Sequence, residues 1–361
     1  MVESRLQSRG EGSDIEIRNL YKIFGPNAAA HVDAVRNGLG KDELNAAHGH
    51  VLGLNDINLT IPSGRITVVM GLSGSGKSTL IRHINRLIDP TAGEILYEGQ
   101  DIARMSQAQL LEFRRSKTAM VFQKFALMPH RTVMQNVGYG LGIRGVAEAR
   151  RNEIARHWIS RVGLDGFEDR YPNQLSGGMQ QRVGLARALA NDAEILLMDE
   201  AFSALDPLIR MEMQGILLDL QQELHKTIVF ITHDLDEALR LGDKVAILRD
   251  GQLIQQGTGE SIVLRPRDGY IADFVREVSR GKVIHVGTIM RRGAPVDTPV
   301  ALPRTATLDE AARALTNADI NRANVVDDTG RHLGVVTLAK IVAEMIAPDD
   351  SEPLEDDAVA A

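Results

Sequence analysis

Short, almost wholly apolar runs alternate with helical stretches along much of the chain. Four of these runs span four or five residues each: Ile66–Met70, Ile195–Met198, Ile228–Ile231 and Val245–Leu248. Apolar runs of this length are typical of strands buried on both faces of a parallel sheet. The segment Lys77–Ile88 instead carries its apolar residues at helical spacing, and Asp89-Pro90 is expected to end that helix. The pattern predicts an α/β fold with a largely parallel sheet.

Strand patterns are scarce in about residues 124–187, where helical spacing prevails, for example around Ile154–Val162. We therefore expect a helical subdomain here, inserted into an α/β body that spans residues 1–280. A second change of pattern follows at residues 284–347, which predict a small separate α/β unit.

The predicted small unit consists of one helix and two short strands. The helix is expected at Leu308–Leu315, and the strands at Asn324–Val326 and Leu333–Val336. The turn Asp327–Gly330 separates the two strands, which favours a hairpin.

The charges are unevenly distributed. The net charge is −7, and residues 348–361 supply six of these charges because they contain six acidic residues and no Lys or Arg. We expect this acidic tail to be disordered. The rest of the chain is near neutral and lacks the basic surface that binds nucleic acid, so no nucleic-acid partner is expected.

Three absences narrow the class of protein. The chain has no cysteine, which excludes disulfides, a thiol nucleophile and Cys-ligated metal centres. Residues 1–14 lack the apolar core of a signal peptide, and no stretch reaches the roughly 18 apolar residues that span a bilayer. We expect a cytoplasmic protein.

A phosphate-binding loop follows the first buried strand. Gly71–Thr79 fits the pattern G-x-x-x-x-G-K-[ST] between a strand and a helix. Its glycines let consecutive N–H groups face a triphosphate at the positive end of the helix dipole. Lys77 is expected to reach the β- and γ-phosphates, and the Ser78 hydroxyl to bind Mg²⁺. The candidate nucleotide-binding residues of the loop are Gly71, Ser73, Gly74, Ser75, Gly76, Lys77, Ser78 and Thr79.

Two carboxylates come directly after the strand Ile195–Met198. Asp199 emerges where it can help to hold Mg²⁺. Glu200 points elsewhere because adjacent side chains diverge at a strand end, and that suits a general base for the attacking water.

The segment Leu175–Arg182 begins a second glycine-rich helix. Ser176 is expected to cap it, and Gly177 and Gly178 lie in its first turn, which makes a second anion-binding helix N-terminus. Two phosphate sites in one chain suggest that the second serves the nucleotide of another copy. In this order the three motifs resemble those of the ABC ATPases, although Met179 stands where the commonest signature has Gln. The resemblance implies ATP, Mg²⁺ and a homodimer.

Further positions match the family pattern one by one. Gln123 matches the glutamine that senses Mg²⁺ and the attacking water and that faces the membrane partner. Ser203–Asp206, with Asp206 as its last residue, matches the loop that crosses the dimer interface. His233 matches the histidine that contacts the γ-phosphate. Phe24 matches the aromatic residue that stacks on adenine, with Tyr21 as its competitor for that role.

The resemblance is more specific in several segments that extend it over about residues 14–280. Four segments together look like those of the glycine betaine/choline (quaternary amine) importer ATPases: the insertion Ala30–His50, Met70–Gly76, Phe122–Thr132 and Glu200–Pro207. This resemblance implies an ATP-hydrolysing subunit that powers import of a compatible solute such as glycine betaine, choline or proline betaine. The implied partners are an integral membrane permease and, through it, an external solute-binding protein. The implied location is the cytoplasmic face of the inner membrane, as a peripheral subunit.

Two other functions stay open at this point. One is an ABC importer ATPase for another small solute, because the solute is recognised outside this chain. The other is a soluble ABC ATPase that acts on nucleic acid. A single nucleotide-binding domain without a long coiled-coil insertion favours transport.

Residues 284–347 resemble one CBS motif, on the segments Thr307–Ala311, Asn324–Gly330 and Leu333–Val336. CBS motifs usually occur in pairs, and only one is found here. The strands of a single motif are expected to leave apolar faces exposed, which favours pairing between two chains. A ligand-binding role and a scaffold without a ligand both remain open.

Overall fold

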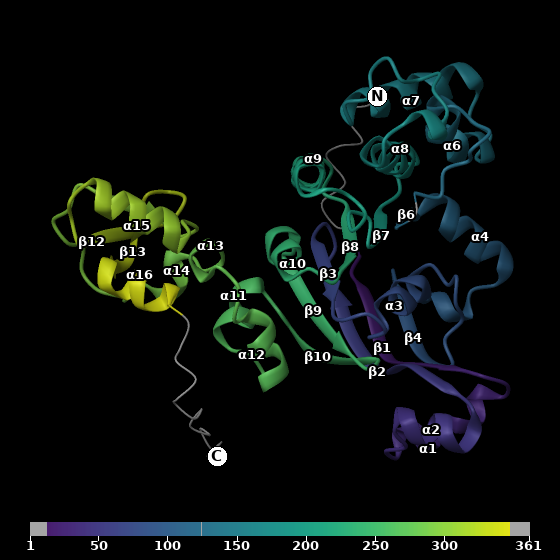
Figure 1. The fold of residues 1–361 in the computed structure, drawn as a ribbon, viewed down its shortest axis with the longest axis horizontal. Coiled ribbons are helices and arrows are strands. Elements are labelled where there is room, and N and C mark those ends of the chain that lie inside the picture. The colour runs from purple at the N-terminus through teal and green to yellow at the C-terminus, as the bar shows by residue number, and fades with distance from the viewer. Residues whose placement is uncertain (1–12, 124, 347–361) are drawn as a thin grey trace. The chain divides into compact units, whose positions relative to one another are not determined.

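The computed structural model describes residues 13–123 and 125–346, and the chain divides into two compact units after Thr258. The first unit contains two sheets, and the second contains a small sheet with helices (Figure 1). The acidic tail expected at residues 348–361 lies outside the described residues.

The larger sheet of the first unit has six strands in the order β10-β9-β3-β8-β7-β6. All neighbouring strands are parallel except β10, which is antiparallel to β9. The central strands β3, β7 and β8 are buried along their whole length, as their apolar runs predict. The strands are β3 (Ile66–Met70), β6 (Thr118–Phe122), β7 (Ile195–Asp199), β8 (Thr227–Thr232), β9 (Lys244–Arg249) and β10 (Gln252–Gly257).

The smaller sheet of this unit is antiparallel, in the order β2-β1-β4-β5. Side chains from both sheets form one hydrophobic core with helices α3 and α4, and Ile15, Leu80 and Val229 are among its fully buried members. The strands are β1 (Ile15–Phe24), β2 (Val51–Ile61), β4 (Ala92–Tyr97) and β5 (Gln100–Asp101). The prediction of an α/β fold is confirmed, with this antiparallel sheet in addition.

Helices lie between the strands of the first unit in chain order. They are α3 (Lys77–Ile84), η3 (Ile102–Arg104), α4 (Gln107–Ser116), α9 (Pro207–Leu224) and α10 (Leu235–Leu241). Helix α3 ends at Ile84, so the prediction of a helix up to Ile88 is wrong. Arg86 has a left-handed backbone with φ of 49°, through which a helix cannot continue. Its guanidinium holds this turn through the Asp89 carboxylate and the Met105 carbonyl, both at 2.6 Å.

Between β6 and β7 the described residues form helices and turns. The helices are α5 (Val133–Val137), α6 (Tyr139–Ile143), α7 (Glu148–Arg161), η4 (Pro172–Gln174) and α8 (Gly177–Ala190). Figure 1 shows α6, α7 and α8 as one group beyond the end of β6. Helix α8 is the most buried of them, with eight buried residues, and packs against α5, α6 and α7.

The insertion expected at Ala30–His50 forms η2 (Ala28–His31), α1 (Val32–Arg36) and α2 (Lys41–His48). Its apolar residues Val32, Val35 and Leu44 form a separate cluster with Tyr21 and neighbouring strand residues. The insertion is therefore packed onto the antiparallel sheet rather than extended into solvent.

The second unit contains a three-stranded sheet in the order β11-β12-β13. Its first helices pack with its last ones: the Arg280 guanidinium donates to the Glu344 carbonyl at 2.7 Å. The structural boundary therefore comes before the change of composition near residue 280. The elements are α11 (Gly259–Leu264), α12 (Gly269–Val275), α13 (Arg280–Val283), α14 (Val286–Ile289), β11 (Ala301–Pro303), α15 (Leu308–Asn317), β12 (Arg322–Val326), β13 (His332–Thr337) and α16 (Leu338–Met345).

The expectation of exposed apolar strand faces in this unit is wrong. Ala323 and Val325 of β12 are buried on one face, and Val326 and Val335 on the other face are half-buried. Among the described residues of this unit, the exposed large apolar side chains are instead Val342, on α16, and Ile346, directly after it.

Candidate functional site

The glycine loop curls between β3 and α3 because three of its residues adopt positive φ. Gly71, Gly74 and Gly76 have φ of 149°, 80° and 101°. A Cβ on Gly71 would lie 2.1 Å from the Leu248 carbonyl oxygen. Only glycine fits this position, so the loop's conformation is set by the packing beneath it as well as by its own sequence.

Lys77 folds back over the loop. Its side chain is 4% exposed, and its Nζ donates to the carbonyl oxygens of Gly71 (2.8 Å) and Leu72 (3.0 Å). Burial lowers the pKa of Lys77, and the carboxylates of Glu200 and Asp199 partly oppose that shift. A buried cation held mainly by neutral carbonyls is suited to binding an anionic phosphate in their place.

The other loop residues differ in accessibility. Ser75 Oγ is buried and has no hydrogen-bond partner among the described atoms, which is rare for a buried hydroxyl and fits a bound phosphate oxygen. Ser73 and Gly74 are exposed, and Ser78 and Thr79 are half-buried at the start of α3.

Ser78 and Asp199 form the oxygen pair expected for Mg²⁺. Ser78 Oγ donates to Asp199 Oδ1 at 2.7 Å, and Asp199 is 4% exposed. A hydroxyl and a carboxylate are ligands that Mg²⁺ prefers, and few protein ligands are needed when phosphates supply others. Among the described residues no group of three or more His, Cys, Asp or Glu is placed to hold a metal ion. Arg82, which the sequence analysis missed, donates to Asp199 Oδ2 at 3.1 Å.

Glu200 is surrounded by three of the predicted residues. Its carboxylate accepts from Gln123 Nε2 at 3.0 Å and lies 3.8 Å from Lys77 Nζ and 3.7 Å from His233 Nδ1. Its positive φ of 46° gives it an unusual backbone for a residue at a strand end. The side chain keeps 19% exposure, so water can reach it.

Gln123 lies at the end of β6 and bonds to Glu200 and to Ser203 Oγ (3.3 Å). These bonds go to the Glu200 loop rather than to the Ser78–Asp199 pair. The structure thus brings Gln123, Lys77 and His233 together at Glu200.

Phe24 and Tyr21 differ in accessibility. Phe24 is 39% exposed at the end of β1, whereas Tyr21 is 6% exposed and belongs to a hydrophobic cluster. A Cβ on Gly53 would lie 2.7 Å from Phe24 Cε2, so the glycine allows the ring to lie against β2. Of these two rings, only that of Phe24 is accessible, as stacking on a base requires.

A further glycine supports the phosphate loop, and the sequence analysis missed it. Gly251, between β9 and β10, donates its N–H to the Ser75 carbonyl at 3.0 Å. A Cβ there would lie 2.9 Å from the Gly53 carbonyl oxygen. The Asp250-Gly251 pair is a turn signal, but only the fold brings that turn to the loop.

The second glycine-rich turn has the predicted local geometry. Ser176 Oγ accepts from the Met179 N–H at 3.3 Å and caps α8. A Cβ on Gly178 would lie 2.7 Å from Ile209 Cγ2, whereas one on Gly177 would lie 3.7 Å from Phe125. Asp206 caps α9 by accepting from the Ile209 N–H at 3.1 Å.

No hydrogen bond or ion pair of the described chain joins Ser176, Gly177, Gly178 or Asp206 to the phosphate loop. A single copy therefore does not bring the two glycine-rich turns together.

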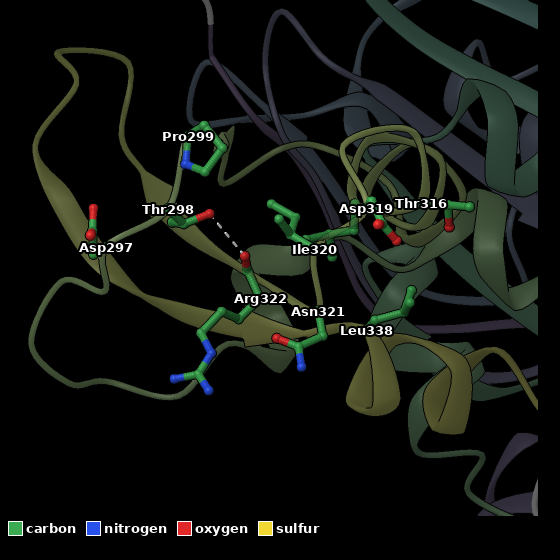
Figure 2. Close-up of a pocket in the computed structure, with 10 residues that line it drawn as sticks. Asp297, Thr298, Pro299, Thr316, Asp319, Ile320, Asn321, Arg322 and Leu338 are labelled. Carbon is green, nitrogen blue, oxygen red and sulfur yellow. Dashed lines mark hydrogen bonds between the residues drawn. The ribbon is translucent and has the colours of Figure 1, made fainter.

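The second unit contains a separate pocket of about 530 Å³ (Figure 2). It combines carboxylates, an arginine, an amide and hydroxyls, and the Thr298 hydroxyl donates to the Arg322 carbonyl at 3.1 Å. Its lining includes Asp297, Thr298, Thr316, Asp319, Asn321 and Arg322. Exposed Val342 lines an adjoining apolar hollow.

A phosphate loop, an acidic strand end and a second glycine-rich helix start, on a parallel sheet with a helical insertion, define a P-loop ATPase of the ABC class. The ABC transporter family model matches residues 54–203, and the CBS domain model matches residues 286–347. No helix in the described ranges is both long and apolar enough to cross a membrane.

The chain is similar to curated transport proteins over most of its length. It is 50% identical to the glycine betaine transport ATP-binding protein OpuAA of Bacillus subtilis over 322 aligned residues. This alignment covers 89% of this chain and 76% of OpuAA. It is 47% identical over 335 residues to the glycine betaine/proline betaine transport ATP-binding protein ProV of Salmonella typhimurium, covering 92% and 82%. A trimethylamine N-oxide transport ATP-binding protein of Ruegeria pomeroyi is 46% identical, covering 89% and 94%.

A solved structure supports the fold. The dimeric ATP-binding cassette MJ0796, in a post-hydrolysis state with ADP and Pi, superposes with a TM-score of 0.58 at 31% identity, covering 68% of this chain and 98% of that one. The chain belongs to the family of ABC transporter ATP-binding subunits. It is an ATPase that binds ATP and couples ATP hydrolysis to solute import. Membership of this family implies a membrane permease as partner and dimerisation of the ATP-binding subunit.

Proposed function

We propose that this chain powers the import of a quaternary-amine compatible solute of the glycine betaine type through a separate permease. One observation carries the solute class. Relatives named for glycine betaine align with 89% to 92% of this chain at 46% to 50% identity. Methionine importers at 44% identity align with only 63% to 66%. The similarity to betaine transporters therefore extends into the second unit.

In ATP hydrolysis, Lys77 and the loop Gly71–Thr79 hold the phosphates, and Phe24 stacks on adenine. Glu200 accepts a proton from the attacking water, which its 19% exposure supports. Gln123 and His233 position that water and the γ-phosphate, and the support for this is their closeness to Glu200, at 3.0 and 3.7 Å.

Ser78 and Asp199, with Gln123 as a further ligand, would hold Mg²⁺. The support is the 2.7 Å hydroxyl–carboxylate pair. When bound, the ion neutralises charge that develops on the phosphate oxygens.

Two copies form the complete site. The Ser176–Gly178 turn and Asp206 of one copy complete the nucleotide site at the phosphate loop of the other. Two features support this arrangement: among the described residues no hydrogen bond or ion pair joins the turn to the phosphate loop of its own chain, and the solved relative is dimeric.

The permease is engaged through the helical group. A groove of about 740 Å³ lies over α5, α6 and α7, and Ile143 within it is 51% exposed. His130–Thr132 also line the groove, and Gln123 at Glu200 comes only a few residues earlier in the chain. A shift in this short segment can pass from the groove to the catalytic carboxylate.

The remaining parts of the proposal concern organisation. The first unit, which ends at Thr258 rather than at residue 280 as the sequence pattern predicts, acts as the ATP-binding domain, with a helical subdomain at about 124–187. Residues 284–347 act as a single CBS-like regulatory motif. The subunit lies at the cytoplasmic face of the inner membrane, and an external solute-binding protein delivers the solute.

The test is reconstitution of the tagged full-length chain with the membrane protein that co-purifies with it. We expect ATP-dependent transport of radiolabelled glycine betaine, and its loss in Lys77→Ala. Choline, carnitine, trimethylamine N-oxide and methionine serve as competitors. Transport of methionine without betaine would overturn the solute class, and co-purification of nucleic acid in place of a membrane protein would overturn the transport role.

A further inference from the structure

The guanidinium of Arg210, in the first turn of α9, lies between two loops of the site. Its Nη1 is 3.3 Å from Asp234 Oδ2, and its Nη2 donates to the Leu205 carbonyl at 3.2 Å. A guanidinium is planar, and its donors have a fixed geometry. The two contacts are therefore geometrically linked, and a displacement of one loop changes the position of the other.

The contact with Asp234 bears on His233. Asp234 is the next residue and caps α10 by accepting from the Glu237 N–H at 3.0 Å, while its own N–H donates to Thr232 Oγ1. These bonds fix how the chain leaves β8. The position of Asp234 thus decides how close the His233 ring comes to Glu200, which is 3.7 Å away, just beyond hydrogen-bond distance.

The contact with Leu205 bears on the loop Ser203–Asp206. Ser203 Oγ donates to the Glu200 carbonyl at 2.9 Å and accepts from Gln123 Nε2 at 3.3 Å. This loop is thereby bonded to Glu200 at its beginning and to Arg210 near its end. Arg210 closes a ring of contacts around the candidate general base.

Helix packing alone does not explain Arg210. Helices α9 and α10 are already joined further along by Gln214, which donates to Glu237 at 3.0 Å and accepts from Arg240 at 2.9 Å. Gln214 and Glu237 are both buried. Moreover, Arg210 Nε is buried without a hydrogen-bond partner among the described atoms, which costs stability. An arginine selected only to join the helices would have its donors satisfied.

We propose that Arg210 is a positioning residue that couples the loop Ser203–Asp206 to the loop of His233. When a second copy engages the first loop, Arg210 carries the displacement to Asp234 and sets the His233 ring against Glu200 and the γ-phosphate. The proposal rests on the proposed function, in which Ser203–Asp206 faces the second copy and His233 contacts phosphate.

The test compares steady-state ATPase kinetics and ATP affinity of full-length variants. We expect Arg210→Gln to lower kcat by about 10- to 100-fold, as misplaced catalytic groups do, with KM and the Kd for ATP nearly unchanged. Arg210→Lys keeps the positive charge but not the planar set of donors that contacts both loops, so its kcat should lie between those of Arg210→Gln and the native chain. The matched control is Arg240→Gln, which removes a guanidinium from the same helix pair without touching either loop and should leave kcat near that of the native chain.

A double-mutant cycle separates this proposal from the proposed function. Arg210→Gln should cause little further loss in a His233→Ala background, because both changes act on one group. Additive losses, an unchanged kcat in Arg210→Gln, or equal losses in Arg210→Gln and Arg240→Gln would each overturn the coupling. An unchanged kcat in His233→Ala alone would instead overturn the role proposed for His233. If Arg210→Gln does not fold, Asp234→Asn keeps the helix cap and should give the same loss of kcat.

Discussion

At the scale of single residues, the site brings together a left-handed backbone, a buried charge and an unpaired hydroxyl. Glu200 has a left-handed backbone, which costs about 1–3 kcal/mol for a residue other than glycine. Lys77 is buried with its Nζ held mainly by neutral carbonyls, and Ser75 has an unpaired hydroxyl. The costs at Lys77 and Ser75 are offset when a nucleotide supplies the missing charge and hydrogen bond.

Replacing Glu200 by Gln tests the general base. The amide keeps the size of the side chain but cannot accept a proton from water, so turnover should fall by roughly 10²-fold or more while ATP binding is retained. ATPase assays and nucleotide titration measure both quantities. As a control, Glu223→Gln alters an exposed carboxylate paired with Arg161 and should leave turnover within about twofold. Normal turnover in Glu200→Gln would exclude its catalytic role.

His83 should make stability depend on pH. Burial lowers the pKa of His83 to about 4, against about 6.5 in the unfolded chain. The unfolded state therefore binds more protons between these values, and the free energy of unfolding falls as pH drops below 6.5. Between pH 7 and pH 5 this loss is about 2 kcal/mol.

Urea unfolding at the two pH values, with the native chain and His83→Gln, measures that loss. The variant cannot titrate there, so its free energy of unfolding should change less with pH. The same pH dependence in both proteins would contradict the assignment.

At the scale of elements, close approaches between backbones place the site. Gly53, Gly76 and Gly251 allow β2, the phosphate loop and the β9–β10 turn to meet without side chains between them. Helix α8 likewise approaches α9 through Gly178. These glycines therefore act through packing as well as through backbone freedom.

Gly178 and Gly177 offer a matched comparison. A methyl group on Gly178 must displace Ile209, because the Cβ would lie 2.7 Å from Ile209 Cγ2. Gly178→Ala should therefore lower the free energy of unfolding by about 1–3 kcal/mol. Gly177→Ala makes only an ordinary contact and should leave stability the same or higher, since alanine favours a helix. Urea unfolding of both variants decides the point, and equal effects would contradict it.

At the scale of the whole molecule, one copy holds two half-sites that do not meet. At the phosphate loop, Lys77 and the Ser78 hydroxyl are in place, and Ser78 bonds to the Asp199 carboxylate. Ser176, by contrast, only caps its own helix. The composite site that we propose therefore needs a second copy, and the solved relative MJ0796 is dimeric.

Mixing two inactive variants tests the composite site. Ser176→Arg should keep nucleotide binding but lose cooperative hydrolysis, and Lys77→Ala should lose binding because the lysine contacts ground-state phosphates. A heterodimer of the two has one site with both halves intact, so the mixture should recover part of the ATPase activity. The Ser176 cap itself is worth about 0.5–2 kcal/mol, so unfolding of Ser176→Arg is measured as a control. Full turnover in Ser176→Arg alone would contradict the composite site.

The sequence alone determined the features that depend on local pattern. Buried strands such as Ile66–Met70 could be predicted because a central parallel strand is apolar throughout. The phosphate loop, the Asp199-Glu200 pair and the Ser176 cap could be predicted because each needs fixed residue types at fixed spacing. The class of protein followed from the order of these motifs.

Only the tertiary structure decided which distant residues meet. Three contacts depend on how strands and helices far apart in the chain pack together. Arg82 bonds to Asp199, Gly251 lies against the phosphate loop, and Arg210 bonds to two loops. Helix α3 ended early for the same reason, since the Arg86 side chain bonds to the Met105 carbonyl, in the segment that directly follows η3. Local patterns record propensity and periodicity, whereas such contacts depend on strand order and on which backbones can approach each other, which no single segment encodes.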